Sequence, residues 1–240
     1  MKEYYTRYDE RYKAVYAAGA ERWGHSPKDE ELTHELTKWV SRYNLQGKRV
    51  IEYAAGEGAG GYVLCSLGCD YTGIEISEAA CEKARSLLSG FPHARVTAMD
   101  MVKERTEKDA YDAAFDSMGI HMLITDAHRK AYLENVFASL KKGAPAFFFH
   151  ECYLEDAYSG SVDTLDEWAE ITKSDYSSKE ERTVQETGQT VLLPRLPARP
   201  KNKQDYIKEF EDAGFIVDEF INIGESRKCI YAASIHVHKP

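Results

Sequence analysis

Apolar residues follow two different rhythms along the chain. Residues 26–40 place Leu32 and Leu36 on one helical stripe, as in an amphipathic helix. Ser26 stands at the expected N-cap of this helix and Pro27 in its first turn. Further along, short apolar runs typical of buried strands alternate with longer helical segments. The predicted strands are 49–53, 71–76, 94–99, 111–115 and 144–151.

This alternation predicts a parallel sheet, because strands separated by helices need crossover connections that leave helices on both faces. A last helix is expected over 202–214, followed by strands over 215–223 and 229–238. Only residues 224–228 separate these two strands, so they are predicted to form an antiparallel hairpin at the sheet edge. The predicted fold class is α/β: a Rossmann-like doubly wound sheet, mostly parallel, with an antiparallel C-terminal hairpin strand.

The composition narrows the classes of protein. With 240 residues, of which 43% are hydrophobic, the chain is long enough for one large core. The net charge of -9 disfavours a nucleic-acid partner, because phosphate binding depends on clustered Lys and Arg. No apolar run reaches the roughly 18 residues of a membrane span, and residues 1–13 lack the apolar stretch of a signal peptide. We therefore expect a cytoplasmic protein without a membrane partner.

A glycine-rich loop follows the first predicted strand. The sequence AAGEGAGG, residues 54–61, holds Gly56, Gly58 and Gly61 in the spacing of the dinucleotide fingerprint. Glycines let the backbone turn tightly and approach a ligand closely. Glu75 ends the second strand, near the spacing of about 20 residues expected for a ribose-binding acid. This pattern alone leaves an NAD- or flavin-dependent oxidoreductase open.

Three further features resemble the class I S-adenosylmethionine-dependent methyltransferases. The segment EYAAGEG, which begins at Glu52, is similar to the E-x-G-x-G-x-G loop of that family, with Ala54 in place of the first glycine. Asp100 ends the third strand, where the family has an acid near the adenine amino group. The closing hairpin is similar to the reversed last strand of the methyltransferase sheet. We favour this family over an oxidoreductase, because nicotinamide-binding sheets usually lack such a reversed strand. We favour it over a non-catalytic methyltransferase-like subunit, because a site that is no longer used should lose its acids, and Glu75 and Asp100 are both in place.

The resemblance implies S-adenosylmethionine as cofactor and S-adenosylhomocysteine as its product. It assigns Glu75 to the ribose hydroxyls and Asp100 to the adenine. The alternatives without a ligand are a solvated strand end for Glu75 and a helix cap for Asp100. The full set of implied cofactor contacts is Glu52, Ala54, Gly56, Gly58, Glu75, Ile76, Asp100, Met101, Asp116, Ser117 and Trp23.

The reaction implied is in-line methyl transfer to a small-molecule acceptor through an oxygen, nitrogen or sulfur nucleophile. Such a nucleophile has to lose its proton, and histidine is the usual helper. His121, just after the fourth strand, and His150, at the end of the fifth, are the candidate catalytic bases, with a purely structural histidine as the alternative for each. Residues 11–27 are similar to the N-terminal part of the thiopurine and thiol methyltransferases, which implies that Trp23 covers the cofactor; packing between helices is the alternative.

The chain is predicted to form a single methyltransferase domain over 1–240. Its expected parts are an N-terminal helical cap (1–45), a cofactor-binding core (46–150), a substrate-side excursion (151–200), and a closing helix and β-hairpin (201–240). The prolines of the segment LLPRLPARP predict no regular structure there. Arg195 and Arg199 in the same segment are expected on a solvated loop face. The scattered cysteines and histidines suggest no metal site.

Overall fold

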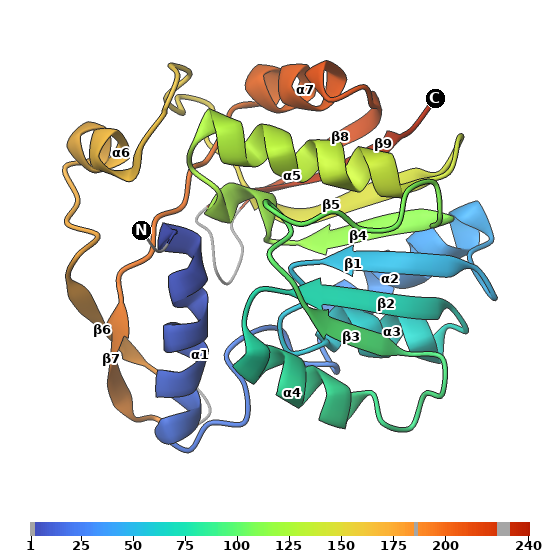
Figure 1. Cartoon of the computed structure of the whole chain (residues 1–240), viewed down its shortest axis with the longest axis horizontal. Helices are drawn as coiled ribbons and strands as arrows, with labels where there is room; N and C mark the ends of the chain where they lie inside the picture. The colour runs from blue at the N-terminus through green and yellow to red at the C-terminus, as the bar shows by residue number, and fades with distance from the viewer. Residues whose placement is uncertain (1–2, 185–186, 225–230) are drawn as a thin grey trace.

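A seven-stranded sheet forms the centre of the molecule (Figure 1). This computed structural model describes residues 3–184, 187–224 and 231–240. The strands of the sheet lie in the order β3-β2-β1-β4-β5-β9-β8. Their bounds are Arg49–Tyr53 (β1), Asp70–Glu75 (β2), Arg95–Ala98 (β3), Ala113–Ser117 (β4), Pro145–Cys152 (β5), Ile216–Gly224 (β8) and Ala232–His238 (β9). Strands β1 to β5 are parallel to one another, and β9 is antiparallel to both β5 and β8, which confirms the predicted fold class.

The C-terminal hairpin forms one end of the sheet, as predicted. Its inner strand, β9, pairs with β5, and its outer strand, β8, is the edge strand. This order makes β8 parallel to β5, because both run antiparallel to β9. Most of the predicted connection lies outside the described residues, since these end at 224 and resume at 231.

Helices cover both faces of the sheet. Residues of α2 and α3 pack against one face together with Phe115 and Phe147, and residues of α5 and α7 pack against the other with Tyr53 and Phe148. The helical elements are Tyr4–Arg7 (η1), Tyr8–Ala17 (α1), Glu30–Tyr43 (α2), Ala59–Ser66 (α3), Glu78–Leu87 (α4), Ile120–Met122 (η2), Asp126–Ser139 (α5), Leu165–Thr172 (α6) and Lys203–Asp212 (α7). In the described part of the chain, no helix has both the length and the apolar character needed to cross a membrane.

Helix α2 begins later than the sequence predicted. Its N-cap is Asp29, whose carboxylate accepts hydrogen bonds from the backbone N–H groups of Glu31 and Leu32 at 3.1 and 3.2 Å. The Ser26 hydroxyl instead accepts a hydrogen bond from the N–H of Lys28 in the preceding turn. The N-cap prediction was therefore wrong. Ser26 and Asp29 can both cap a helix, and the Ser26 hydroxyl is used in the turn before α2.

The segment between β5 and α7 contains more regular structure than predicted. Residues Lys179–Thr183 (β6) and Thr190–Pro194 (β7) form a two-stranded antiparallel ribbon. Pro194 is the last residue of β7. Proline has no backbone N–H, and at this strand end no hydrogen bond to a further strand is lost. The ribbon lies beside α1, at the edge to which the parallel strands point (Figure 1), and Val15 of α1 packs with Val184 and Leu193. The segment thus extends the wall around the strand ends.

Candidate active site

A cavity opens where the carboxyl ends of β1, β2 and β4 meet, which is also where the strand order reverses. One side of the cavity comes from the loops after β1, β2, β3 and β4, and the other comes from η1, α1 and residues 23–25. The predicted cofactor residues that line it are Glu52, Ala54, Gly56, Glu75, Ile76, Asp100, Met101, Ser117 and Trp23. The strand ends thus bring most of the predicted set to one place.

The glycine loop turns through the left-handed backbone region. Gly56 has a φ of 52°, and so does Ala54, which carries a side chain in a conformation that costs about 1–2 kcal/mol. Room for the Ala54 methyl group comes from Gly119, where an added Cβ would stand only 2.8 Å from it. Gly58 begins α3 and faces Ala84 of α4. Its lack of a side chain lets the two helices approach each other, and it is not among the residues that line the cavity.

Glu52 lies buried beneath the glycine loop. The Tyr71 hydroxyl donates a hydrogen bond to its carboxylate, and a Cβ on Gly60 would come within 2.3 Å of its Oε1 atom. Burial raises the pKa of Glu52 to about 8. At neutral pH, Glu52 is therefore a mainly protonated support for the loop.

Glu75 joins the turns that follow β1 and β2. Its Oε2 atom accepts a hydrogen bond from the N–H of Gly56, and its Oε1 atom accepts one from the N–H of Ser77, both at 2.9 Å. Burial raises the pKa of this carboxyl, while the backbone N–H groups lower it. A carboxylate has about four acceptor positions, so these two bonds leave acceptor positions on each oxygen for ribose hydroxyls.

Asp100 combines a capping role with a place on the cavity wall. Its Oδ1 atom accepts hydrogen bonds from the N–H groups of Val102 and Lys103, at 3.1 and 3.2 Å. The Tyr5 hydroxyl donates to its Oδ2 atom at 3.2 Å. Met101 lines the cavity beside it and is otherwise buried. Asp100 thus caps a turn and not the helix that the alternative supposed, and its place on the cavity wall leaves the predicted adenine role open.

The two predicted residues at the end of β4 point to different places. Ser117 lines the cavity, and its buried Oγ atom has no hydrogen-bond partner among the described residues. The Asp116 carboxylate lies behind the loop, where it accepts hydrogen bonds from the N–H of Gly119 at 2.8 Å and the hydroxyl of Tyr132 at 2.7 Å. Asp116 therefore supports the loop and is not among the residues that line the cavity.

Neither predicted catalytic histidine lies on the cavity wall. His121 is buried, and its ring Nδ1 atom lies 2.7 Å from Oε2 of Glu151. The backbone N–H of His121 donates a hydrogen bond to the same oxygen. The ring of His150 stacks on Phe149, and its Nε2 atom lies 3.0 Å from Oε1 of Glu31 at the start of α2. Both histidines thus have carboxylate partners away from the cavity lining, which fits the structural alternative for each.

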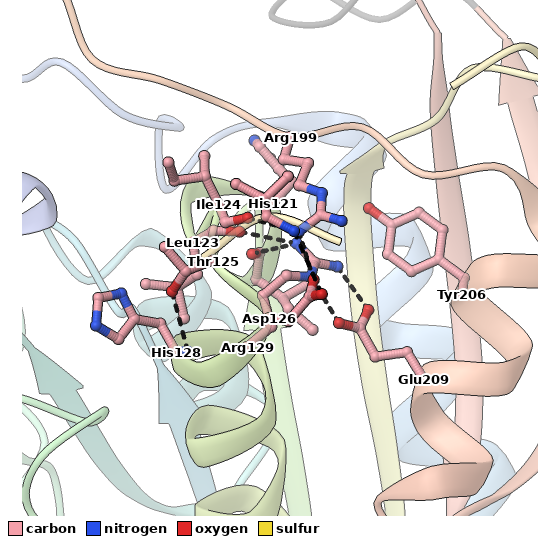
Figure 2. Close-up of polar contacts among 12 residues, drawn as sticks. His121, Leu123, Ile124, Thr125, Asp126, His128, Arg129, Arg199, Tyr206 and Glu209 are labelled. Carbon is pink, nitrogen blue, oxygen red and sulfur yellow. Dashed lines mark hydrogen bonds and ion pairs between the residues drawn. The ribbon is translucent and has the colours of Figure 1, made fainter. Parts of the chain in front are cut away.

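Two buried arginines bind backbone carbonyl groups of the loop after β4, as Figure 2 shows. Arg129 donates to the carbonyl oxygen of Leu123 at 3.1 Å and forms a two-bond pair with Glu209. Arg199 donates to the carbonyl oxygen of Ile124 at 2.6 Å and is 1% exposed. The expectation of a solvated Arg199 was wrong, because these backbone carbonyls needed buried donors.

The N-terminal segment closes over the cavity through Glu57 of the glycine loop. The Glu57 carboxylate accepts hydrogen bonds from the N–H groups of Trp23 and Gly24, at 2.8 and 2.6 Å, and from the Tyr16 hydroxyl at 2.8 Å. Trp23 and His25 both line the cavity. Nδ1 of His25 lies 3.1 Å from the carboxylate of Asp29, the N-cap of α2.

Several cavity residues were not predicted individually. Tyr5, Tyr8 and Tyr12 line the cavity from η1 and α1, and Tyr16 reaches Glu57. Their spacing of three or four residues places them on one helical face. That spacing is a signal that can be read from the sequence.

Glu52 predicts a specific pH dependence of stability. Its pKa is 4.5 in its ordinary state and about 8 in the fold, so the folded chain binds the proton more tightly and the free energy of unfolding falls as pH rises between these values. Glu52→Gln removes this loss, which amounts to at most about 1.4 kcal/mol per pH unit. Urea unfolding from pH 5.5 to 8.0 should therefore show a flatter profile for the variant. Parallel profiles would contradict the assignment.

Comparison with known proteins supports the family suggested by the loop and the acids. Residues 50–143, from β1 to the end of α5, match the family model of the methyltransferase domain. No curated protein sequence matches the chain.

Solved structures share the architecture at low identity. A S-adenosylmethionine-dependent methyltransferase from Methanosarcina mazei is 18% identical, with a TM-score of 0.64 over 84% of this chain and 96% of that chain. The 1,6-didemethyltoxoflavin N1-methyltransferase of Burkholderia thailandensis, solved with 1,6-didemethyltoxoflavin and S-adenosylhomocysteine, is 14% identical, with a TM-score of 0.67 over 98% and 88%. The cyclase SpnF is also 14% identical, with a TM-score of 0.66 over 99% and 97%.

Since one of these neighbours is named as a cyclase, the shared fold does not by itself specify a reaction. The family match, the glycine loop and the strand order agree with one another. Residues 50–143 therefore resemble a methyltransferase domain, and the chain as a whole shares the fold of S-adenosylmethionine-dependent methyltransferases.

Proposed function

We propose that this protein transfers the methyl group of S-adenosylmethionine to a small-molecule acceptor. The observation that carries the proposal is the meeting of Gly56, Glu75 and Asp100 in one cavity. When bound, the cofactor supplies a methyl group already activated by its sulfonium. The protein's task is then mainly to hold the nucleophile, the methyl carbon and the sulfur in line.

The residues present fit this cofactor. Glu75 has acceptor positions for the ribose hydroxyls, and Asp100 and Met101 offer a polar and an apolar contact for the adenine. Gly56 leaves the loop bare beside the methionine part. The Ser117 hydroxyl, which is buried on the cavity wall without a partner among the described residues, would gain one from the same part of the cofactor.

A small acceptor is supported by the cover over the site. Helix α1 and residues 23–25 lie across the cavity, and the β6–β7 ribbon packs on α1. Tyr8, Met118 and Met122 line the cavity with large side chains. The 1,6-didemethyltoxoflavin N1-methyltransferase, which has the same fold, was solved with 1,6-didemethyltoxoflavin bound. We therefore propose a small, partly aromatic acceptor.

His25 is the histidine on the cavity wall and takes the role expected of His121. The Asp29 carboxylate at 3.1 Å from Nδ1 would orient the ring and stabilise its protonated form. We propose that His25 removes the proton from an oxygen or nitrogen acceptor.

The donor site is tested by binding of S-adenosylhomocysteine in calorimetry. Glu75→Ala should weaken binding at least about 10-fold, since charge-assisted hydrogen bonds contribute roughly 1.5–3 kcal/mol each. Glu78→Ala, on the exposed side of α4, is the matched control and should bind like wild type. NADH should not compete. Unchanged affinity in Glu75→Ala would remove this residue from the site, and tighter binding of NADH would favour an oxidoreductase.

The proton-transfer role is tested by the pH dependence of turnover with a methylated acceptor. His25→Asn should lower turnover by roughly 10²–10⁴ while S-adenosylhomocysteine affinity stays near wild type, because a general base acts only in the transition state. Asp29→Asn keeps an N-cap side chain but loses the charge, so its profile should move to lower pH. A His25→Asn profile identical to that of wild type would exclude His25 as the base.

A further inference from the structure

Arg11 is a buried cation on the wall of the cavity. It comes from α1, and its side chain is 12% exposed. Its Nη2 atom donates to the carbonyl oxygen of Pro194 at 2.9 Å. Its Nε atom is buried and has no hydrogen-bond partner among the residues that the structure describes. A buried donor without an acceptor costs roughly 1–3 kcal/mol, which a ligand with a suitable oxygen would recover.

Aromatic rings flank the guanidinium. Its Cζ atom lies 5.6 Å from the ring centre of Trp23 and 5.8 Å from that of Tyr8, and both rings line the cavity. A guanidinium group is planar and weakly hydrated, so it suits a planar anion between aromatic walls.

The charges around Arg11 are unbalanced. Glu180 is the carboxylate within 4 Å of Arg11, at 3.4 Å, and it also faces Arg182 at 3.1 Å and Arg195 at 3.7 Å. One carboxylate is thus shared among these guanidinium groups. Arg182 and Arg195 are about half exposed and hydrated, whereas Arg11 is not. Arg11 therefore shares its close carboxylate with two hydrated guanidinium groups, while its own side chain lines the cavity.

We propose that Arg11 binds a carboxylate inside the cavity, an inference that rests on the proposed function. A singly charged anion fits better than a phosphate, because Glu57 and Glu75 also line the cavity and repel a second negative charge. Either of two molecules can supply this carboxylate: the cofactor, through its amino-acid tail, or an aromatic acceptor that carries a carboxylate.

The first arm of the test compares two nucleosides. Calorimetry measures S-adenosylhomocysteine, which has the amino-acid tail, and 5′-methylthioadenosine, which lacks it, on wild type, Arg11→Met and Arg11→Gln. Arg182→Met, which alters an exposed partner of the same Glu180, is the control and should match wild type. If the carboxylate is the cofactor's, both Arg11 variants bind S-adenosylhomocysteine about 10- to 100-fold more weakly and keep wild-type affinity for 5′-methylthioadenosine.

The second arm tests the acceptor as the source. Benzoate and indole-3-carboxylate are titrated by NMR into each protein, with and without S-adenosylhomocysteine, alongside the neutral amides of both acids. If the carboxylate is the acceptor's, wild type binds the acids in preference to the amides, and the Arg11 variants lose that preference. Circular dichroism establishes that each variant is folded. If Arg11→Met does not fold, Arg11→Gln is used in its place.

The inference is overturned if the Arg11 variants change neither nucleoside binding nor the preference for acids over amides. Equal weakening of both nucleosides, without an effect on the acids, would also overturn it, since Arg11 would then act through packing alone. Wild-type protein that binds neither nucleoside would contradict the proposed function, and the acid titrations would still decide the role of Arg11.

Discussion

The hydrogen bonds of the Glu75 carboxylate hold the two halves of the donor site together. One oxygen binds the N–H of Gly56 in the loop after β1, and the other binds the N–H of Ser77 at the start of α4. The Ser77 hydroxyl in turn donates to Asp9 of α1 at 2.8 Å. A single buried side chain therefore links the glycine loop, the second strand and the helix that covers the cavity.

The two sides of the cavity are stabilised by different interactions. Buried charged and polar side chains, Asp116 and Arg129 among them, bind the backbone of the loop after β4, so that this side has few alternative arrangements. The covering elements η1 and α1 are attached partly through hydroxyl groups: Tyr5 of η1 donates to Asp100, and Tyr16 of α1 donates to Glu57. The strand-end side is thus held by buried polar groups that bind its backbone, and the covering side by contacts between side chains.

Much of the fold was predictable because the local pattern of apolar residues shows which side chains are buried. The apolar run at 49–53 gave β1 its observed bounds, Arg49–Tyr53, and the stripe of Leu32 and Leu36 predicted a helix that is indeed buried on that side. The rim positions of Glu75 and Asp100 followed from the strand ends.

Side-chain direction was not predictable in the same way. His121 lies at the predicted strand end, yet its ring turns away because Glu151, on a different strand, binds it. Ala54 is accommodated only because Gly119, far along the chain, lacks a side chain. Such contacts depend on tertiary packing between distant residues, which hydrophobic periodicity does not encode.

The most direct test of the donor site is a crystal structure of the complex with S-adenosylhomocysteine. The account predicts that both ribose hydroxyl oxygens lie within about 3 Å of the Glu75 carboxylate, with the adenine beside Asp100 and Met101. A ribose bound away from Glu75, or a nucleoside bound outside this cavity, would contradict it.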